Sequence, residues 1–402
     1  MFHYYVYQMK KINIWKTVAI VSLVIIVTIG GIYLYNDGLF RRDYELNDEL
    51  GGNIFPSAIL SIATTDTVVI KPAGNHYLGN PKSGFIIRMK SGRANSKVRI
   101  TLGKTPYFEK SVSEFVLEES GTVYQIFPDV IWNYNALKNN IQAAPVSVSV
   151  EVEVNGTSLG QKVRTFSVRS INECLLAYLD SKQQFHDTGI FFAAYVNEEH
   201  PMIDKLLREA LNTRIVNRFV GYQSDKPGSV DKQVYVLWNV LQKRNFKYSS
   251  VSTSSLSSNV AFSQRVRTLD DALESSQINC VDGSVLFASL LRAINLDPIL
   301  VRMPGHMFVG YYLDKYHKKK DFLETTMIGD VNLDDFFPDE KLDSTIVGKS
   351  QNEMSRITFE KSKQYANNLF EKNLNGIRTH QRFYMYLEIS REVRRYIQPI
   401  GK

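Results

Sequence analysis

A cysteine, a histidine and a glutamate occur in this order, each at the start or end of a regularly patterned segment. Cys280 opens a run in which apolar residues recur at helical spacing as far as Ile294, so the thiol belongs to the first turn of a predicted helix. Free backbone amides and the helix dipole favour the thiolate there. His306 heads a strand behind a Pro-Gly turn, and Glu324 lies in the next short segment, DFLETT. A thiolate, a base and an orienting carboxylate are the parts of a nucleophilic acyl-transfer site.

The period of the two strands determines whether these groups can meet. Alternation places His306 on the face shared by Phe308, and Glu324 on the face shared by Phe322 and Thr326. We therefore predict that Cys280 Sγ lies within ~4 Å of one ring nitrogen of His306, with Glu324 hydrogen-bonded to the other. A register slip of one residue would turn Glu324 to the opposite face and break the arrangement.

Each of the three residues also has an ordinary structural interpretation. A lone cysteine is usually an inert core residue, a strand histidine can cap a turn, and a strand glutamate can simply be exposed. Cys280 fits that interpretation poorly, because it follows Asn279 at a helix start and is close to Asp282 and Gly283 rather than inside an apolar stripe. The order of the three residues therefore favours a joint site.

Taken together, these segments resemble the transglutaminase-like fold of the papain-like cysteine enzymes. The matching features are Cys-x-Asp on a helix, Gly-His-x-Phe-Val on a strand and a carboxylate-Thr pair on the next strand. The similarity extends upstream to VDKQVYVLWNVLQKRNFKYSS, which resembles the pre-catalytic helix of that family. It covers residues 230–330 by motif and 200–402 as a domain. The family usually has an aspartate followed by Pro-Thr where this chain has Glu324 followed by two threonines.

The resemblance implies a cysteine enzyme that needs no cofactor and acts on a peptide, protein or cell-envelope amide. Cys280 would be the nucleophile, His306 the base and Glu324 the residue that orients the imidazole. The acyl group would pass to water, as in a peptidase or amidase, or to an amine, as in a cross-linking enzyme. The Cys280 amide would bind the oxyanion with a second donor, and the candidates for substrate or oxyanion contacts are Gln233, Trp238, Asn279 and Asp282.

Two other classes of function remain open. The domain could be a catalytically silent binding module that holds a peptide or a cell-envelope polymer in a transglutaminase-like groove. Alternatively, the chain could be a structural or assembly protein whose β domain is the functional part.

The N-terminal region contains an uncharged stretch at residues 17–35. A bilayer core requires ~20 such residues, and no small-x-small cleavage site follows the stretch, which argues against a signal peptide. We therefore expect a single transmembrane helix that anchors the protein in a membrane. Residues 1–16 would form a cytoplasmic tail and the large C-terminal region would be extracytoplasmic.

The remaining chain divides by its periodicity. Residues 36–55 are polar and predict a linker. Residues 56–170 predict an all-β, sandwich-like domain, because five valines between Val146 and Val154 alternate with polar residues and Asn155-Gly156 supplies a hairpin turn. Residues 171–402 are helical and mixed in pattern and match the transglutaminase-like domain. The predicted fold class is α+β, with the transmembrane helix first, the β-sandwich second and the papain-like domain last.

Composition and charge exclude several classes of function. With 44% hydrophobic and 22% charged residues the chain is typical of globular protein, and a net charge of +7 without a basic, aromatic patch argues against nucleic-acid binding. No His or Cys spacing predicts a metal site. Two cysteines do not make a disulfide framework, so Cys174 is expected to be a buried or linker thiol; a Cys174–Cys280 bridge is the alternative. The basic run Lys315–Lys320 is expected to be a solvated hairpin tip, or else a contact for acidic ligands.

Overall fold

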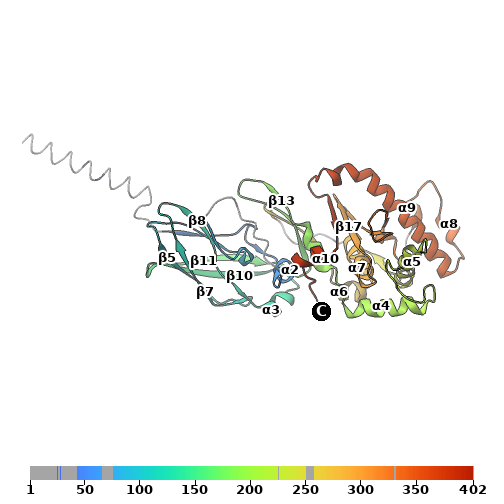
Figure 1. The fold of residues 1–402 in the computed structure, drawn as a ribbon, viewed down its shortest axis with the longest axis horizontal. Helices are drawn as coiled ribbons and strands as arrows, with labels where there is room; N and C mark the ends of the chain where they lie inside the picture. The colour runs from blue at the N-terminus through green and yellow to red at the C-terminus, as the bar shows by residue number, and fades with distance from the viewer. Residues whose placement is uncertain are drawn as a thin grey trace, which may run out of the picture.

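The computed structural model of the chain describes residues 43–65, 76–224, 226–249, 258–329 and 332–401, together with Ile25 and Thr28. Its strand-rich first half and its mixed second half lie side by side along the long axis of the molecule (Figure 1). The described residues form an α+β fold.

The predicted fold class included a transmembrane helix, and this part of the prediction is corrected by the structure. Among the described residues no helix is long and apolar enough to cross a membrane. A spanning helix needs ~20 mainly apolar residues, whereas the longest described helix, α9 (Gln351–Arg378), carries charged side chains along its length. The stretch 17–35 lies outside the described residues, except for Ile25 and Thr28.

The first half contains a four-stranded sheet of order β1-β4-β8-β3 and a five-stranded sheet of order β2-β11-β10-β5-β7. The strands of the two sheets are β1 (Tyr44–Asn47), β2 (Asn53–Ile54), β3 (Tyr77–Gly79), β4 (Ile86–Lys90), β5 (Ser96–Leu102), β7 (Ser111–Leu117), β8 (Val123–Phe127), β10 (Ala144–Val154) and β11 (Thr157–Val168). A small pair, β6 (Phe108–Glu109) and β9 (Ile131–Trp132), and the short helices α2 (Pro56–Ile62), η1 (Pro81–Ser83) and α3 (Tyr134–Lys138) accompany them.

The alternating valines of β10 are all buried, and they join one apolar cluster to which both sheets contribute. Asn155 and Gly156 have φ values of 51° and 78°, so both residues have the positive φ that a tight type I′ hairpin turn requires. The hairpin predicted from these residues is therefore present, with Val154 paired to Thr157.

The segment predicted as a linker contributes strands to the sandwich. Tyr44 in β1 is only 1% exposed, and its hydroxyl donates to Val150 O at 2.6 Å. Strand β1 pairs with β4, and β2 pairs with β11. The sheets therefore begin before residue 56, at Tyr44.

The second half is built around an antiparallel sheet of order β19-β18-β17-β20 and a three-stranded sheet of order β13-β12-β15. The strands are β12 (Glu173–Leu179), β13 (Phe185–Asp187), β14 (Lys247–Tyr248), β15 (Ala261–Arg265), β16 (Gln277–Ile278), β17 (Pro298–Met303), β18 (His306–Tyr312), β19 (Lys320–Leu323) and β20 (Met385–Glu388). The helices, besides α9, are η2 (Gly189–Tyr195), α4 (Pro201–Asn212), α5 (Ser229–Gln242), α6 (Leu269–Ser275), α7 (Cys280–Ala293), η3 (Thr325–Met327), η4 (Leu333–Asp335), α8 (Asp343–Ile346) and α10 (Arg391–Tyr396).

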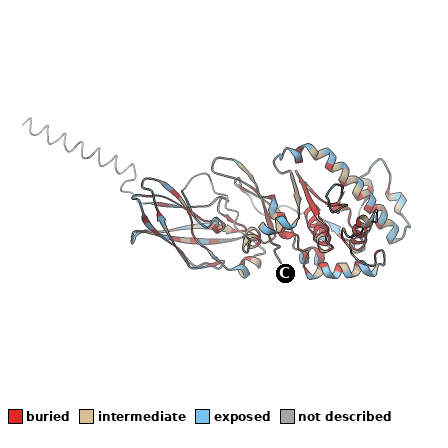
Figure 2. Ribbon diagram, in the orientation of Figure 1, coloured by how far each residue is buried: buried red, intermediate tan, exposed pale blue. Residues whose placement is uncertain are grey.

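Strand β18 is buried on both faces. Val309 and Tyr311 belong to the large apolar cluster that includes α7, whereas Phe308 packs with Phe322 and Phe370 in the cluster next to α9. Figure 2 shows β17, β18 and α7 buried along most of their length. Because α7 is enclosed by the core and the sheet, its first residue is held at a fixed position beside the start of β18.

Candidate active site

Cys280 is the first residue of α7, and its position is fixed by the capping of that helix. Asn279 Oδ1 accepts from the backbone N–H groups of Val281 and Asp282, each at 2.8 Å. In return, the carboxylate of Asp282 accepts from Asn279 N at 3.1 Å, which completes a capping box. The Cys280 side chain is therefore anchored at the positive end of a buried helix, and the residue is 8% exposed.

Asp282 is tied to the segment before α6. Its carboxylate accepts from Arg267 N at 2.8 Å and from Arg267 Nη1 at 2.5 Å, and its side chain is fully buried. Burial raises the pKa of this carboxyl and outweighs the opposing bonds from Arg267 and Asn279. Asp282 thus fixes the start of the helix and is not positioned as an oxyanion donor.

His306 is presented by the tight turn between β17 and β18. Met303 pairs with His306 across Pro304 and Gly305, and Gly305 has a φ of 78°. A positive φ at this place suits glycine, since it has no Cβ to clash. The Pro-Gly turn predicted from the sequence therefore places His306 at the end of the sheet, where its side chain is 25% exposed.

Glu324 contacts His306, although it is not part of a strand. Strand β19 ends at Leu323, and Glu324 is the N-cap of the 3₁₀ helix η3. The prediction that Phe322, Glu324 and Thr326 share one face of a strand is therefore wrong. Glu324 Oε2 lies 2.6 Å from His306 Nε2. Its Oε1 accepts from Thr326 N at 3.1 Å and from Thr326 Oγ1 at 2.7 Å. The turn at Glu324 satisfies this fully buried carboxylate and directs it at the imidazole.

The main chain of Glu324 is held by helix α9. Ser362 Oγ accepts from Glu324 N at 2.8 Å and donates to Glu324 O at 3.2 Å. Nothing local in the sequence around Glu324 indicates this contact, because Ser362 lies in a helix much further along the chain. Ser362, Arg267 and Thr326 are positioning residues that the sequence did not identify.

The electrostatics of His306 favour the imidazolium. Burial lowers the pKa of His306, but side-chain hydrogen bonds with Cys280 and Glu324 and their negative charges outweigh it and raise that pKa to about 10. Since Nε2 faces Glu324, Nδ1 is the nitrogen left for the Cys280 thiol. The structure thus brings His306 and Glu324 into direct contact, with Cys280 close enough to affect the pKa of His306.

Two tyrosines border this group. Burial raises the hydroxyl pKa of Tyr248, and the charges of Cys280 and Glu324 add to the increase. Burial and the charge of Glu324 also raise the hydroxyl pKa of Tyr365 in α9. Tyr248 is 52% exposed and lies in β14, beside the strand that leads into α7, so it forms part of the accessible edge of the site.

The start of α7 also packs tightly against η3. Thr325 Oγ1 lies 3.5 Å from Cys280 O and 3.4 Å from Ser284 Oγ. A Cβ added at Gly283 would lie 2.7 Å from Thr325 Oγ1 and 2.9 Å from Thr325 Cβ. Glycine at this position therefore permits the close approach of the helix that carries Cys280 to the segment that carries Glu324.

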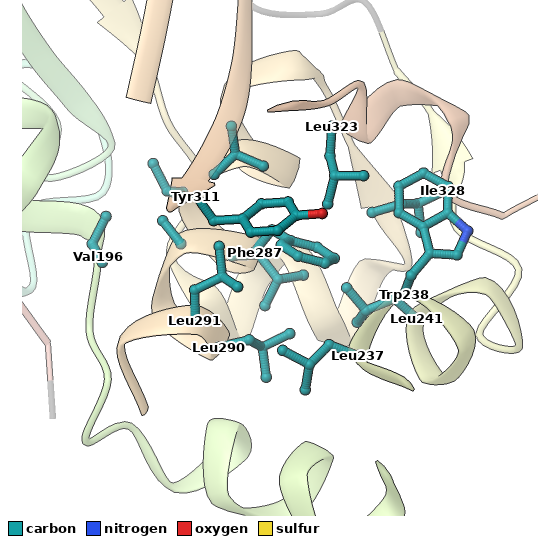
Figure 3. Close-up of a cluster of buried hydrophobic side chains, with 14 of the residues drawn as sticks. Val196, Leu237, Trp238, Leu241, Phe287, Leu290, Leu291, Tyr311, Leu323 and Ile328 are labelled. Carbon is teal, nitrogen blue, oxygen red and sulfur yellow. The ribbon is translucent and has the colours of Figure 1, made fainter. Parts of the chain in front are cut away.

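Gln233 and Trp238, both predicted as oxyanion candidates, serve the fold. Gln233 Oε1 accepts from Val220 N at 2.7 Å and from Gly221 N at 3.0 Å, and its Nε2 donates to Gly221 O at 3.1 Å. Trp238 is fully buried among the core residues in Figure 3, and its Nε1 donates to Thr358 Oγ1 at 3.1 Å. Neither side chain is free to bind a substrate oxygen.

Cys174 and the basic tip lie apart from this group. Both cysteines are free thiols, so they form no disulfide, and burial raises the pKa of Cys174 well above its usual range. The segment Lys315–Lys320 follows the far end of β18, and the length of that strand separates it from His306 by about 20 Å. The basic tip therefore does not border the site.

Among the residues that the structure describes, no group of three or more His, Cys, Asp or Glu side chains could hold a metal ion. Comparison with protein-family models and with curated proteins finds no match to this chain.

Proposed function

We propose that this protein catalyses covalent acyl transfer from an amide substrate through Cys280, His306 and Glu324, as a transglutaminase-like cysteine enzyme. The observation that carries the proposal is the 2.6 Å contact between the buried carboxylate of Glu324 and His306 Nε2, next to a cysteine at a helix N-terminus. A structural histidine has no need of a fully buried carboxylate on one nitrogen and a cysteine close enough to affect its pKa. This arrangement is the one that activates a thiol nucleophile.

In the first step, the Cys280 thiolate attacks the carbonyl carbon, a C–S bond forms, and the π electrons move to the carbonyl oxygen. Collapse of the tetrahedral intermediate breaks the C–N bond, and His306 gives its proton to the departing amine. A thioester to Cys280 remains. Glu324 accepts a hydrogen bond from the other ring nitrogen and so fixes the orientation of the imidazole throughout.

In the second step, water or an amine attacks the thioester carbonyl while His306 takes a proton from it. The C–S bond breaks, the thiolate returns, and the product is a carboxylic acid or a new amide. We propose a peptide, protein or cell-envelope amide as the acyl donor, in keeping with the resemblance. The proposal covers hydrolysis and transamidation alike, since both pass through the same thioester.

The experiment is trapping of the acyl-enzyme with an activated ester, 4-nitrophenyl acetate, followed by peptide-level mass spectrometry. We expect one acetyl group on Cys280, none on Cys174, and release of 4-nitrophenolate in a burst equal to the protein concentration. Cys280→Ala should abolish both signals, and Cys174→Ala should abolish neither. A wild-type protein that alkylates at Cys280 yet never acylates would favour the silent binding module.

A further inference from the structure

Asn279 contains a buried hydrogen-bond donor that has no partner in the described part of the chain. The residue is 1% exposed, and its Nδ2 makes no hydrogen bond among the described residues. An orphaned buried donor is unfavourable, and native structures contain few of them. It therefore indicates either an unfilled acceptor position or a strained cap.

The orientation of this amide is fixed by its other atom. The side-chain oxygen accepts from two backbone N–H groups at 2.8 Å, so that atom must be the oxygen and the orphan must be the NH₂. The backbone N–H of Asn279 donates to the Asp282 carboxylate, and this bond holds the residue in its capping position. The donor is thus held in place before any ligand arrives.

The donor lies beside the nucleophile. Five covalent bonds separate Asn279 Nδ2 from the Cys280 amide nitrogen, so the two nitrogens lie within about 6 Å of each other. The Cys280 amide opens α7 and has no acceptor among the described residues. Two donors without an acceptor among the described residues, one from the backbone and one from a side chain, therefore lie close together at the start of the helix that carries the thiol.

We propose that Asn279 is a catalytic residue whose Nδ2–H donates to the oxyanion of the tetrahedral intermediate, together with the backbone N–H of Cys280. The inference rests on the proposed function and deepens it, since it assigns the second oxyanion donor. Gln233 and Trp238 are already engaged elsewhere, and Asp282 has no amide to donate. The bond is made when the C–S bond forms and charge develops on oxygen, and it transfers no proton.

The test compares two reactions of the same thiol. Alkylation by iodoacetamide displaces iodide at a saturated carbon and develops no oxyanion, whereas acylation by 4-nitrophenyl acetate does. Asn279→Ser keeps an N-cap oxygen but has no amide to donate. We expect this variant to alkylate Cys280 within about twofold of wild type and to acylate about 10²- to 10³-fold more slowly.

Two further variants control the comparison. Asn133→Ser makes the same change at the N-cap of α3, where Asn133 accepts from Ala136 N at 3.1 Å, and it should alter neither rate. Asn279→Asp has the shape of asparagine and keeps the capping oxygen, so it should fold even if the serine variant does not. In this variant, too, the rate of Cys280 acylation should fall by a larger factor than the rate of Cys280 alkylation.

Equal losses of alkylation and acylation in the Asn279 variants would mean that Asn279 only holds the helix, and would overturn the inference. Unchanged acylation would overturn it as well. These outcomes differ from failure of the proposed function, in which wild-type Cys280 itself is not acylated by the ester and the inference falls with it.

Discussion

Replacement of Glu324 by glutamine removes the negative charge that orients His306 and changes the shape of the side chain little. The carboxylate is fully buried, 2.6 Å from Nε2, and it is one of the causes that raise the pKa of His306 to about 10. A hydrogen bond to a charged group contributes about 1.5–3 kcal/mol. Because 1.36 kcal/mol corresponds to one pKa unit, Glu324→Gln should lower the pKa of His306 by about 1–2 units.

The assay is the rate of Cys280 alkylation by iodoacetamide between pH 5 and 9, measured by peptide-level mass spectrometry with Cys174 as the internal control. At pH 6.5 His306 should be protonated in both proteins, so the two rates should agree; from about pH 8 upward the Glu324→Gln profile should depart from that of wild type, because its His306 loses the proton about 1–2 pH units lower. Glu388→Gln changes a carboxylate at the far end of the same sheet, where it accepts from Tyr312, and should have no effect. A Glu324→Gln profile that matches wild type would refute the assigned role of Glu324.

Gly283→Ala places a methyl group 2.9 Å from Thr325 Cβ, so it should cost about 1–3 kcal/mol in the free energy of unfolding and slow acylation of Cys280. Urea unfolding and the ester burst measure the two effects, and a fully active, fully stable variant would contradict the close packing. Because the pKa of His306 is raised in the folded protein, its protonated form adds to the free energy of unfolding. This contribution is complete below about pH 6.5 and is lost as the pH rises through about 10. In urea titrations, the difference in the free energy of unfolding between wild type and His306→Gln should therefore shrink from pH 6 to pH 10. A constant difference would contradict the raised pKa of His306. Changing Lys318 and Lys319 to glutamine should leave alkylation and acylation within twofold of wild type, because the tip lies far from the site.

Local signals in the sequence were enough to predict the elements that carry the nucleophile and the base. Helical spacing placed the start of α7 at Cys280, and the Pro-Gly pair placed the turn before His306. The Asn155-Gly156 hairpin was equally predictable, because only a few residue types suit a turn with two positive φ values. In each case the physical cause lies within a few residues of the feature.

The conformation at Glu324 was wrongly predicted as a strand. Its carboxylate bonds to Thr326 N and Oγ1, and this local competition with the sheet ladder turns the chain into η3. The Ser362 contact depends on how α9 packs, and it could not be inferred from spacing. Gln233 was misjudged for the same reason, since the loop that it holds is brought to it by the tertiary fold.

The boundary of the sandwich was also misplaced. The polar segment 36–55 contains two short strands, and their partners lie further along the chain. Strand β1 pairs with β4, and β2 pairs with β11. Strands this short carry too few residues for an alternating pattern to be recognised. Their pairing becomes visible only when the sheets are assembled.

The most direct test of the proposed acyl transfer is the pH dependence of Cys280 alkylation in the wild-type protein, with Cys174 as the negative control. A thiolate–imidazolium pair keeps its reactivity in mildly acidic solution, so the rate at pH 6.5 should stay within about threefold of the rate at pH 8.5. Cys174, which is fully buried, should remain unmodified throughout. If Cys280 instead loses reactivity about 50- to 100-fold over that interval, as an ordinary thiol does, or is protected as fully as Cys174, then the site does not activate a nucleophile and the proposed acyl transfer is wrong.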